Sequence, residues 1–234
     1  MFKRNKLHLV LTGSNAKLLS NDLATHLTGK SCEIPLHPFS FEEYCTIKRI
    51  NTKGLSTKEI AQRRATFDEY MQRGGFPELM FIKNERTYIS NLVSNVLRRD
   101  IKQRYKISFT ANFENMANRL LNVSPVIPAV SELANTFGFK SLHTVRNYID
   151  YLKQAYILIG VKKYSAKSKM RVTQEKLYAV DVALMNKREN AFASKNLGWR
   201  LETIVLLHLI RKCNYEGLDV YYLKDRSGEC DFVV

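Results

Sequence analysis

The sequence predicts a mixed α/β protein that is mostly helical. Apolar residues recur at helical spacing through most of residues 56–155, and a Ser or Thr precedes several of these segments in a capping position. Short apolar runs without that spacing occur near both ends of the chain and at 156–161, where strands are expected. Hydrophobic residues make up 45% of the 234 residues, which is an ordinary share for one or two globular domains.

The N-terminal segment predicts a β-α-β unit. Residues 7–12 form an apolar run typical of a buried parallel strand, and a helix over 16–27 and a strand over 32–36 follow it. Ligands bind at the carboxyl ends of strands in open α/β sheets, but the sequence contains no Gly-x-x-x-x-Gly-Lys-Ser/Thr phosphate loop. Because a buried strand needs neighbours on both sides, we expect that part of a nucleotide-binding domain is missing upstream. The polar residues after the first strand are Thr12, Ser14 and Asn15.

Three helices are expected between residues 41 and 105. The first, over 41–48, begins at a capping box formed by Ser40 and Glu43. The second stops at Gly74-Gly75-Phe76-Pro77, because paired glycines and a proline cannot continue a helix. The third covers about 85–102 and ends in cations, which suit the negative end of the helix dipole.

The middle of the chain predicts a winged helix. Helices are expected over 112–122, 128–136 and 142–155, with a Gly-containing turn between the second and the third. Strands over 156–161 and 176–180 then form the wing. The third helix is the expected recognition helix.

The C-terminal segment predicts one more amphipathic helix, over 197–212, and a β-hairpin of strands 220–223 and 229–234. The last strand is apolar and has no evident partner, so we expect that the chain is also cut at this end.

The charge of the chain favours a polyanionic partner. Thirty-seven Lys and Arg oppose 22 Asp and Glu, for a formal net charge of +15. The four cysteines are far apart and form no Cys-x-x-Cys pair, which predicts reduced thiols in a cytoplasmic protein. No zinc-type spacing, signal peptide or transmembrane-length apolar run occurs, so we expect no metal site and no membrane span.

Taken in order, five stretches resemble one family of bacterial and archaeal AAA-type ATPases, which carry a C-terminal winged helix and a restriction-endonuclease-like domain of unknown function. The stretches are Leu11-Thr12-Gly13-Ser14-Asn15, Pro38-Phe39-Ser40-Phe41-Glu42-Glu43-Tyr44, Gly74-Gly75-Phe76-Pro77-Glu78, Arg99-Asp100-Ile101 with Tyr105, and Gly198-x-x-Leu201-Glu202 with Glu229-x-Asp231-Phe232. The resemblance implies four segments. They are the C-terminal part of an AAA-type nucleotide-binding core at 1–50, a helical lid at 51–108, a winged helix at 109–185, and the start of a restriction-endonuclease-like domain at 186–234.

In this family the end of the first strand resembles sensor 1, a polar group that detects the γ-phosphate of ATP. Thr12, Ser14 and Asn15 would take that place here, and Ser14 or Asn15 taken alone is better explained as the N-cap of the helix that follows; both readings can hold. Intact relatives are expected to bind ATP and Mg²⁺. The phosphate loop and the acidic metal-binding strand are absent from these 234 residues, so we expect no tight cofactor binding and no ATP hydrolysis by this chain alone.

DNA is the partner that the winged helix predicts. Arg and Asn side chains pair with base edges, and Lys-rich wings contact phosphates. A homo-oligomer or a protein partner is the alternative, because many winged helices bind proteins. The expected nucleic-acid contacts are Thr144, Arg146, Asn147, Lys162, Lys163, Lys167, Lys169 and Arg171, with His143 and Lys153 as further solvent-facing candidates on the third helix.

A Mg²⁺-dependent nuclease is a third reading. Restriction-type nucleases use a helix Glu, a strand Asp and a Glu-x-Lys on the next strand. Glu202 and Asp231 match the first two by position, and Glu229 is a poorer candidate near the hairpin turn. The chain stops before any Glu-x-Lys, so we interpret Glu202 and Asp231 as an incomplete pair. Glu202 is explained equally well as a surface charge on an amphipathic helix.

Overall fold

The computed structural model describes residues 10, 12, 34–108, 110–165, 174–187, 197–225 and 228–234. The predicted strand 7–12, apart from residues 10 and 12, and the predicted helix 16–27 lie outside these residues, as do Ser14, Asn15, Lys167, Lys169 and Arg171. Thr12 is exposed and belongs to no helix or strand. The predicted strand 32–36 is wrong over residues 34–36, which have no regular structure; Pro35 supplies no amide to a ladder there.

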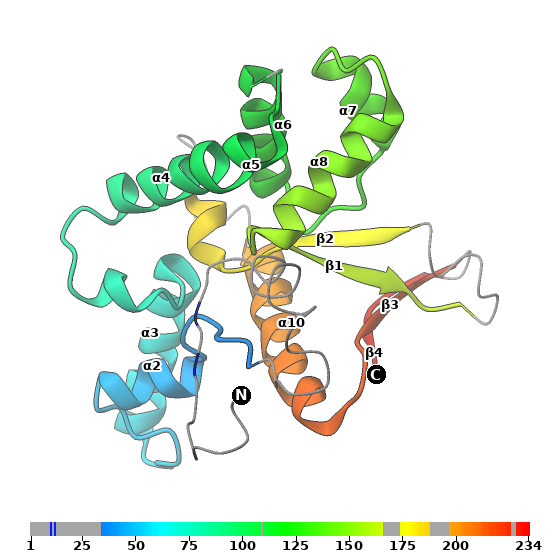
Figure 1. Cartoon of the computed structure of the whole chain (residues 1–234). Coiled ribbons are helices and arrows are strands. Elements are labelled where there is room, and N and C mark those ends of the chain that lie inside the picture. Colours follow the sequence, from blue (N-terminus) through cyan, green and yellow to red (C-terminus); the bar gives the residue numbers. More distant parts are fainter. Residues whose placement is uncertain are drawn as a thin grey trace, which may run out of the picture.

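The architecture is mixed α/β and mostly helical, as predicted (Figure 1). Seven α-helices precede a four-stranded sheet in the described part of the chain, and α10 (Leu197–Glu216) interrupts the strands. A short 3-10 helix, η3 (Val182–Lys187), contacts α3, α4, α6 and α10 and so connects the helical layer to the C-terminal half.

Capping boxes start the first two helices that the structure describes, and the one at Ser40 was predicted. In α2 (Phe41–Ile47) the Ser40 side chain accepts from the Glu43 amide, and the Glu43 carboxylate accepts from the Ser40 amide. Ser56 and Glu59 repeat this reciprocal pair at the start of α3 (Thr57–Arg73). Each box satisfies two amides that the helix leaves without a partner. The helix α3 ends at Gly74, whose φ of 78° lies in the left-handed region that favours glycine.

The predicted helix 85–102 is divided in the structure. An α-helix, α4 (Glu85–Asn95), is followed by a π-helical segment, η2 (Val96–Lys102), and a final turn, α5 (Gln103–Tyr105). The path continues without a break, but the π-turn changes the direction in which the basic residues after Leu97 point.

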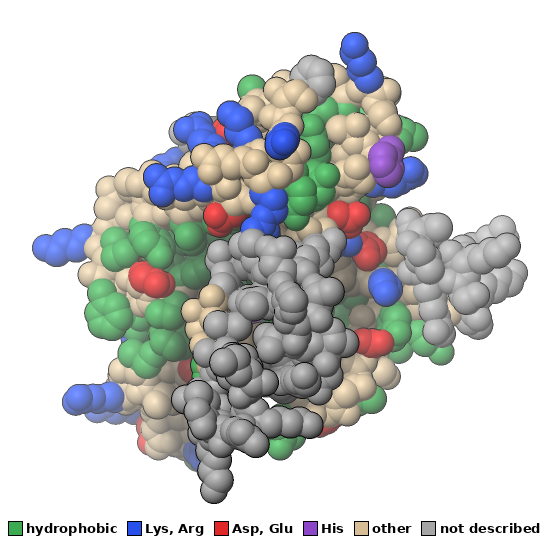
Figure 2. Space-filling view, in the orientation of Figure 1, with side chains coloured by type: hydrophobic (Ala, Val, Ile, Leu, Met, Phe, Trp, Pro, Cys, Tyr) green, Lys and Arg blue, Asp and Glu red, His purple; other side chains and the backbone are tan. Residues whose placement is uncertain are grey.

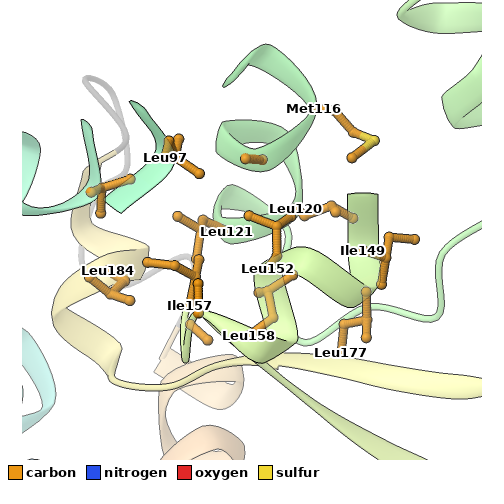
Figure 3. Packing of buried hydrophobic residues seen from close by; sticks show 14 of the residues in the cluster. Leu97, Met116, Leu120, Leu121, Ile149, Leu152, Ile157, Leu158, Leu177 and Leu184 are labelled. Carbon is orange, nitrogen blue, oxygen red and sulfur yellow. The ribbon is translucent and has the colours of Figure 1, made fainter. Parts of the chain in front are cut away.

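Three helices and a strand pair form the middle of the molecule. They are α6 (Thr110–Asn122), α7 (Val130–Thr136), α8 (Leu142–Gln154), and the antiparallel strands β1 (Leu158–Lys163) and β2 (Glu175–Ala179). Ser141 caps α8, as predicted, and Gly138 turns the chain with a φ of 69°. The main core lies here, and Figure 3 shows Leu120 and Leu121 of α6 packed toward Leu152 of α8 and Ile157.

The sheet joins the middle of the chain to its end. Its strand order is β2-β1-β3-β4, where β3 (Tyr221–Lys224) and β4 (Glu229–Val233) form the predicted C-terminal hairpin. The strand β3 pairs with β1 in parallel, through Lys162↔Tyr221 and Lys163↔Tyr222. The expected wing strands therefore share one sheet with the hairpin, and the sheet crosses the predicted segment boundary at 185/186.

Candidate functional site

A buried lysine on β2 contacts three carboxylates, one from α10 and two from β4. The Lys176 Nζ lies 2.8 Å from Oε1 of Glu202, 2.8 Å from Oε1 of Glu229 and 3.3 Å from Oδ1 of Asp231. The Lys176 side chain is 8% exposed, whereas that of Asp231 is 54% exposed, so the cluster opens to solvent on the Asp231 side. We call Lys176, Glu202, Glu229 and Asp231 the lysine–carboxylate cluster.

Strand alternation explains why these side chains meet. Lys176 and Tyr178 are two residues apart on β2 and share a face, as Glu229 and Asp231 do on β4. The helix α10 brings Glu202 to this face, where its Oε1 accepts a hydrogen bond of 2.7 Å from the Tyr178 hydroxyl. At the outer side, Lys224 binds Glu229 at 2.7 Å.

Hydrogen bonds within the cluster change the pKa values of Lys176, Glu229 and Tyr178. Burial alone would favour a neutral amine, but hydrogen bonds to Glu202 and Glu229 outweigh it and raise the pKa of Lys176. Hydrogen bonds from Lys176 and Lys224 lower the pKa of Glu229. Burial and the hydrogen bond to Glu202 raise the pKa of the Tyr178 hydroxyl, which therefore stays a donor. The arrangement is an ammonium held by carboxylates at neutral pH.

These residues do not fit a Mg²⁺ ion as they stand. The ammonium of Lys176 takes the central position that a metal would need, and no group of three His, Cys, Asp or Glu in the described ranges is arranged to hold a metal. We therefore derive no metal-dependent step here. The structure does bring the predicted pair, Glu202 and Asp231, together. Sequence reasoning missed Lys176, although a lysine that opens the apolar strand Lys176-Leu177-Tyr178-Ala179-Val180 was a usable signal.

The exposed side of α8 carries the predicted base-contacting residues. Val145, Tyr148, Ile149 and Leu152 point into the core, as their spacing predicts. On the other side His143 and Arg146 are exposed, and Thr144 and Asn147 are half-buried. Lys153 is engaged instead, because its Nζ lies 2.6 Å from Glu175 and 3.0 Å from Asp150.

The expected wing contacts are only partly described. Lys162 is exposed and Lys163 is half-buried on β1, the strand that directly follows α8 in the chain. Among the residues that the structure describes, none of the predicted α8 or wing contacts belongs to the lysine–carboxylate cluster. The two sets of predicted residues are therefore two sites.

Comparison with known proteins shows the family to which the chain belongs. A family model described as a domain of unknown function, DUF8612, matches residues 64–195, which is more than half of the 234 residues. The chain belongs to this family. A model described as an AAA domain matches residues 1–45, which supports the AAA-type interpretation of the first segment.

Two relatives align with almost the whole chain, including the segments on both sides of the DUF8612 match. An uncharacterized protein of Methanocaldococcus jannaschii, MJ1544, is 30% identical over 235 residues, which cover 97% of this chain and 52% of that protein. An uncharacterized protein of Haemophilus influenzae is 30% identical over 234 residues, which cover 96% of this chain and 55% of that protein. The chain thus spans about half the length of the curated relatives it matches. No solved structure matches the chain.

The DUF8612 match covers only part of the two candidate sites. It includes α8, β1 and β2 with Lys176, but ends before Glu202, Glu229 and Asp231. In the described part of the chain no helix is both long and apolar enough to cross a membrane.

Proposed function

We propose that the chain is a DNA-binding part of an AAA-type protein and that it contacts DNA through a winged helix formed by α6, α7, α8, β1 and β2. In this proposal α8 is the recognition helix and the β1–β2 pair is the wing. The N-terminal segment, which matches an AAA domain, would belong to a nucleotide-binding core that is shared with longer relatives.

One observation carries the proposal. The helix α8 follows a helix and a glycine turn, buries one apolar face, and leaves Arg146 and His143 exposed with Thr144 and Asn147 beside them. Arg and Asn are the side chains that read guanine and adenine edges by paired hydrogen bonds.

The charge of the chain supports the same partner. A net charge of +15 attracts a polyanion, and the exposed Lys162 on β1 is available to a phosphate. The alternative, a protein-interaction module, uses the same helices but requires no steep dependence on salt.

ATP hydrolysis is not part of the proposed activity of this chain. The sequence has no phosphate loop, and of the sensor-type residues only Thr12 is described, where it is exposed and outside any helix or strand. Sensor residues detect a phosphate that other groups hold, so without those groups the first segment binds ATP weakly at most. A cytoplasmic location stays a prediction of the cysteine pattern.

The test measures the binding of the full 234-residue chain to labelled duplex DNA. Fluorescence anisotropy gives the association constant K at a series of salt concentrations. We expect log K to fall steeply with log salt, because bound phosphates release counterions. Arg146→Ala and Asn147→Ala should each reduce sequence preference and cost about 1–3 kcal/mol on a preferred site. A flat salt response, or absence of binding at low salt while a protein partner co-purifies, would favour the interaction module.

A further inference from the structure

We propose that Lys102, Arg104 and Lys106, at the end of η2 and around α5, form a second phosphate-binding element beside α8. We call these three residues the α5 basic segment. The proposal rests on the proposed function of α8 and adds a contact outside the three helices and two strands assigned to the winged helix. Its ligand is the sugar-phosphate backbone of DNA that has entered along α8.

The α5 basic segment is fixed to α8 by an aromatic pair. The rings of Tyr105 and Tyr151 stack with centroids 3.7 Å apart and planes within 4° of each other. The Tyr105 hydroxyl also donates a hydrogen bond of 2.6 Å to Oε1 of Gln154 in the last turn of α8. Because Tyr105 lies between Arg104 and Lys106 in the chain, these contacts hold the backbone that carries both cations beside α8.

The backbone turns sharply directly after Tyr105. Lys106 has a φ of 48°, a left-handed conformation that non-glycine residues rarely adopt. This turn ends the helix and leaves Lys106 exposed, while Arg104 and Lys102 are half-buried at its base. The segment is therefore a fixed projection of α5 and not a continuation of the helix into the core.

The position of this projection suits the backbone of a bound duplex. Asn147 and Tyr151 are one turn apart on α8 and share a face, so the stacked Tyr105 lies on the Asn147 side of the helix. Seven residues separate Asn147 from Gln154, which is about 10 Å along a helix. The major groove is about 12 Å wide. A helix that reads bases near Asn147 therefore has the phosphates at the edge of the groove near its C-terminal end. The α5 basic segment lies at that end.

The local charge is strongly positive. The stretch from Arg98 to Lys106 holds five cations and one carboxylate, that of Asp100. Arg98 binds Glu114 at 3.1 Å, and Arg99 extends the positive surface as an exposed side chain. Figure 2 shows Lys and Arg side chains gathered over α5 and α6 in the upper part of the molecule, beside α8. A run of this charge on a fixed support is suited to a row of phosphates.

The test compares two triple variants of equal charge. One is Lys102→Gln with Arg104→Gln and Lys106→Gln. The matched control is Lys53→Gln with Lys58→Gln and Arg64→Gln, which removes three exposed cations from the α2–α3 part of the chain. Both variants keep Tyr105, and circular dichroism melting shows whether each is folded.

The α5 variant should bind duplex DNA about tenfold or more weakly than wild type at low salt, without a change in sequence preference. The slope of log K against log salt should become shallower by up to about 0.9 for each phosphate that the variant no longer neutralises. The control should stay within about threefold of wild type, because its three cations act on the DNA only from a distance and are screened by salt. Equal decreases in affinity for the two triple variants would overturn the proposal, and so would an unchanged slope in the α5 variant.

The same experiment separates this proposal from the function of α8. If Arg146→Ala weakens binding and the α5 variant does not, the α5 basic segment has no role and α8 keeps its own. If the α5 variant weakens binding while Arg146→Ala and Asn147→Ala leave binding unchanged, the α5 basic segment contacts DNA and α8 is not the recognition helix. Wild-type chain that binds no DNA at low salt contradicts both.

Discussion

The carboxylate of Asp181 accepts a hydrogen bond of 2.9 Å from the amide of Gly75, a residue 106 positions earlier in the chain. Its other oxygen accepts a hydrogen bond of 2.7 Å from the amide of Ala183. Gly75 in turn accepts from the Phe39 amide at 2.7 Å. Two stretches that are distant in sequence therefore meet at one buried carboxyl group, and a third, at Phe39, joins them through Gly75. The Gly74-Gly75 pair, predicted only as a helix stop, is also what allows this close approach.

Gly74→Ala should destabilise the fold severely. A Cβ at position 74 would lie 1.9 Å from Oδ1 of Asp181, and the backbone there has a φ of 78°. Clash and strain together should cost about 3 kcal/mol or more, measured by urea denaturation. Gly198→Ala is the matched control, because no atom lies within 4 Å of a Cβ at that position of α10. Equal midpoints for wild type and Gly74→Ala would show that the Asp181 junction does not limit stability.

Asp181 should make the free energy of unfolding depend on pH in the mildly acidic range. Burial raises the pKa of this carboxyl to about 6, although hydrogen bonds from Ala183 and Gly75 act in the opposite direction. The folded state therefore binds the proton more tightly than the unfolded chain does. Stability from this group is fully present below about pH 4 and is lost as pH rises to about 6, by up to about 3 kcal/mol.

Asp181→Asn is the test of this pH dependence. Between pH 4 and 6 the unfolding free energy of the Asn variant should fall less with rising pH than that of wild type. Asn keeps an oxygen for one amide but offers an NH₂ to the other, so the variant is expected to be somewhat less stable at pH 4. Parallel curves for the two proteins across this window would contradict the assignment.

Glu69 should give the opposite dependence at lower pH. Burial opposes its charge, but hydrogen bonds from Lys48, Arg73 and Tyr44 prevail and lower its pKa to about 2. A lowered pKa stabilises the fold above about pH 4.5, and that contribution is lost as pH falls toward 2. Glu69→Gln should therefore lose less stability than wild type on acidification below pH 4.5. Acid unfolding curves followed by circular dichroism make the comparison, and identical acid midpoints would count against it.

Local structure was largely predictable from the sequence. The sequence predicted the capping box of Ser40 and Glu43 and a cap at Ser56 or Thr57, and the structure confirms the first and assigns the second to Ser56. The apolar stripe of α8 was also predicted correctly, because helical spacing places Val145 and Leu152 on one face whatever the rest of the chain does.

The arrangements that were missed all involve partners distant in sequence. Nothing near Lys176 indicates that α10 and β4 will supply its carboxylates, and nothing near β1 indicates a parallel partner in β3. The π-turn of η2 likewise has no sequence signal of its own in Val96–Lys102. Burial decides these features, and burial is a property of the assembled fold. The convergence of Glu202 and Asp231 was predicted only through the family resemblance.

Lys176→Met should destabilise the protein by about 3–5 kcal/mol. Met fills a similar volume, but it leaves the carboxylates of Glu202 and Glu229 without their shared cation in a mostly buried place. Lys224→Met is the control, because Lys224 binds the same Glu229 from a side chain that is 52% exposed. A surface pair of this kind contributes within about 1 kcal/mol. Comparable urea midpoints for the two variants would mean that the ammonium of Lys176 is not what holds the cluster together.

The Lys176→Met variant should also respond to divalent cations. With the ammonium gone, the three carboxylates that bound it lose their shared cation at a place that Asp231 opens to solvent, and we expect them to adjust around a hard divalent cation that replaces the missing charge. Ca²⁺ or Mg²⁺ at millimolar concentration should raise the Tm of Lys176→Met by several degrees, because a ligand that binds only the folded state stabilises it. Wild type should show little shift, since the ammonium of Lys176 already occupies the position between the carboxylates. The control is Lys176→Met combined with Glu202→Gln and Asp231→Asn, which should lose the response. An equal shift in wild type, or Mg²⁺-dependent plasmid nicking by wild type that disappears in Glu202→Ala and Asp231→Ala, would show that metal reaches the carboxylates despite the lysine.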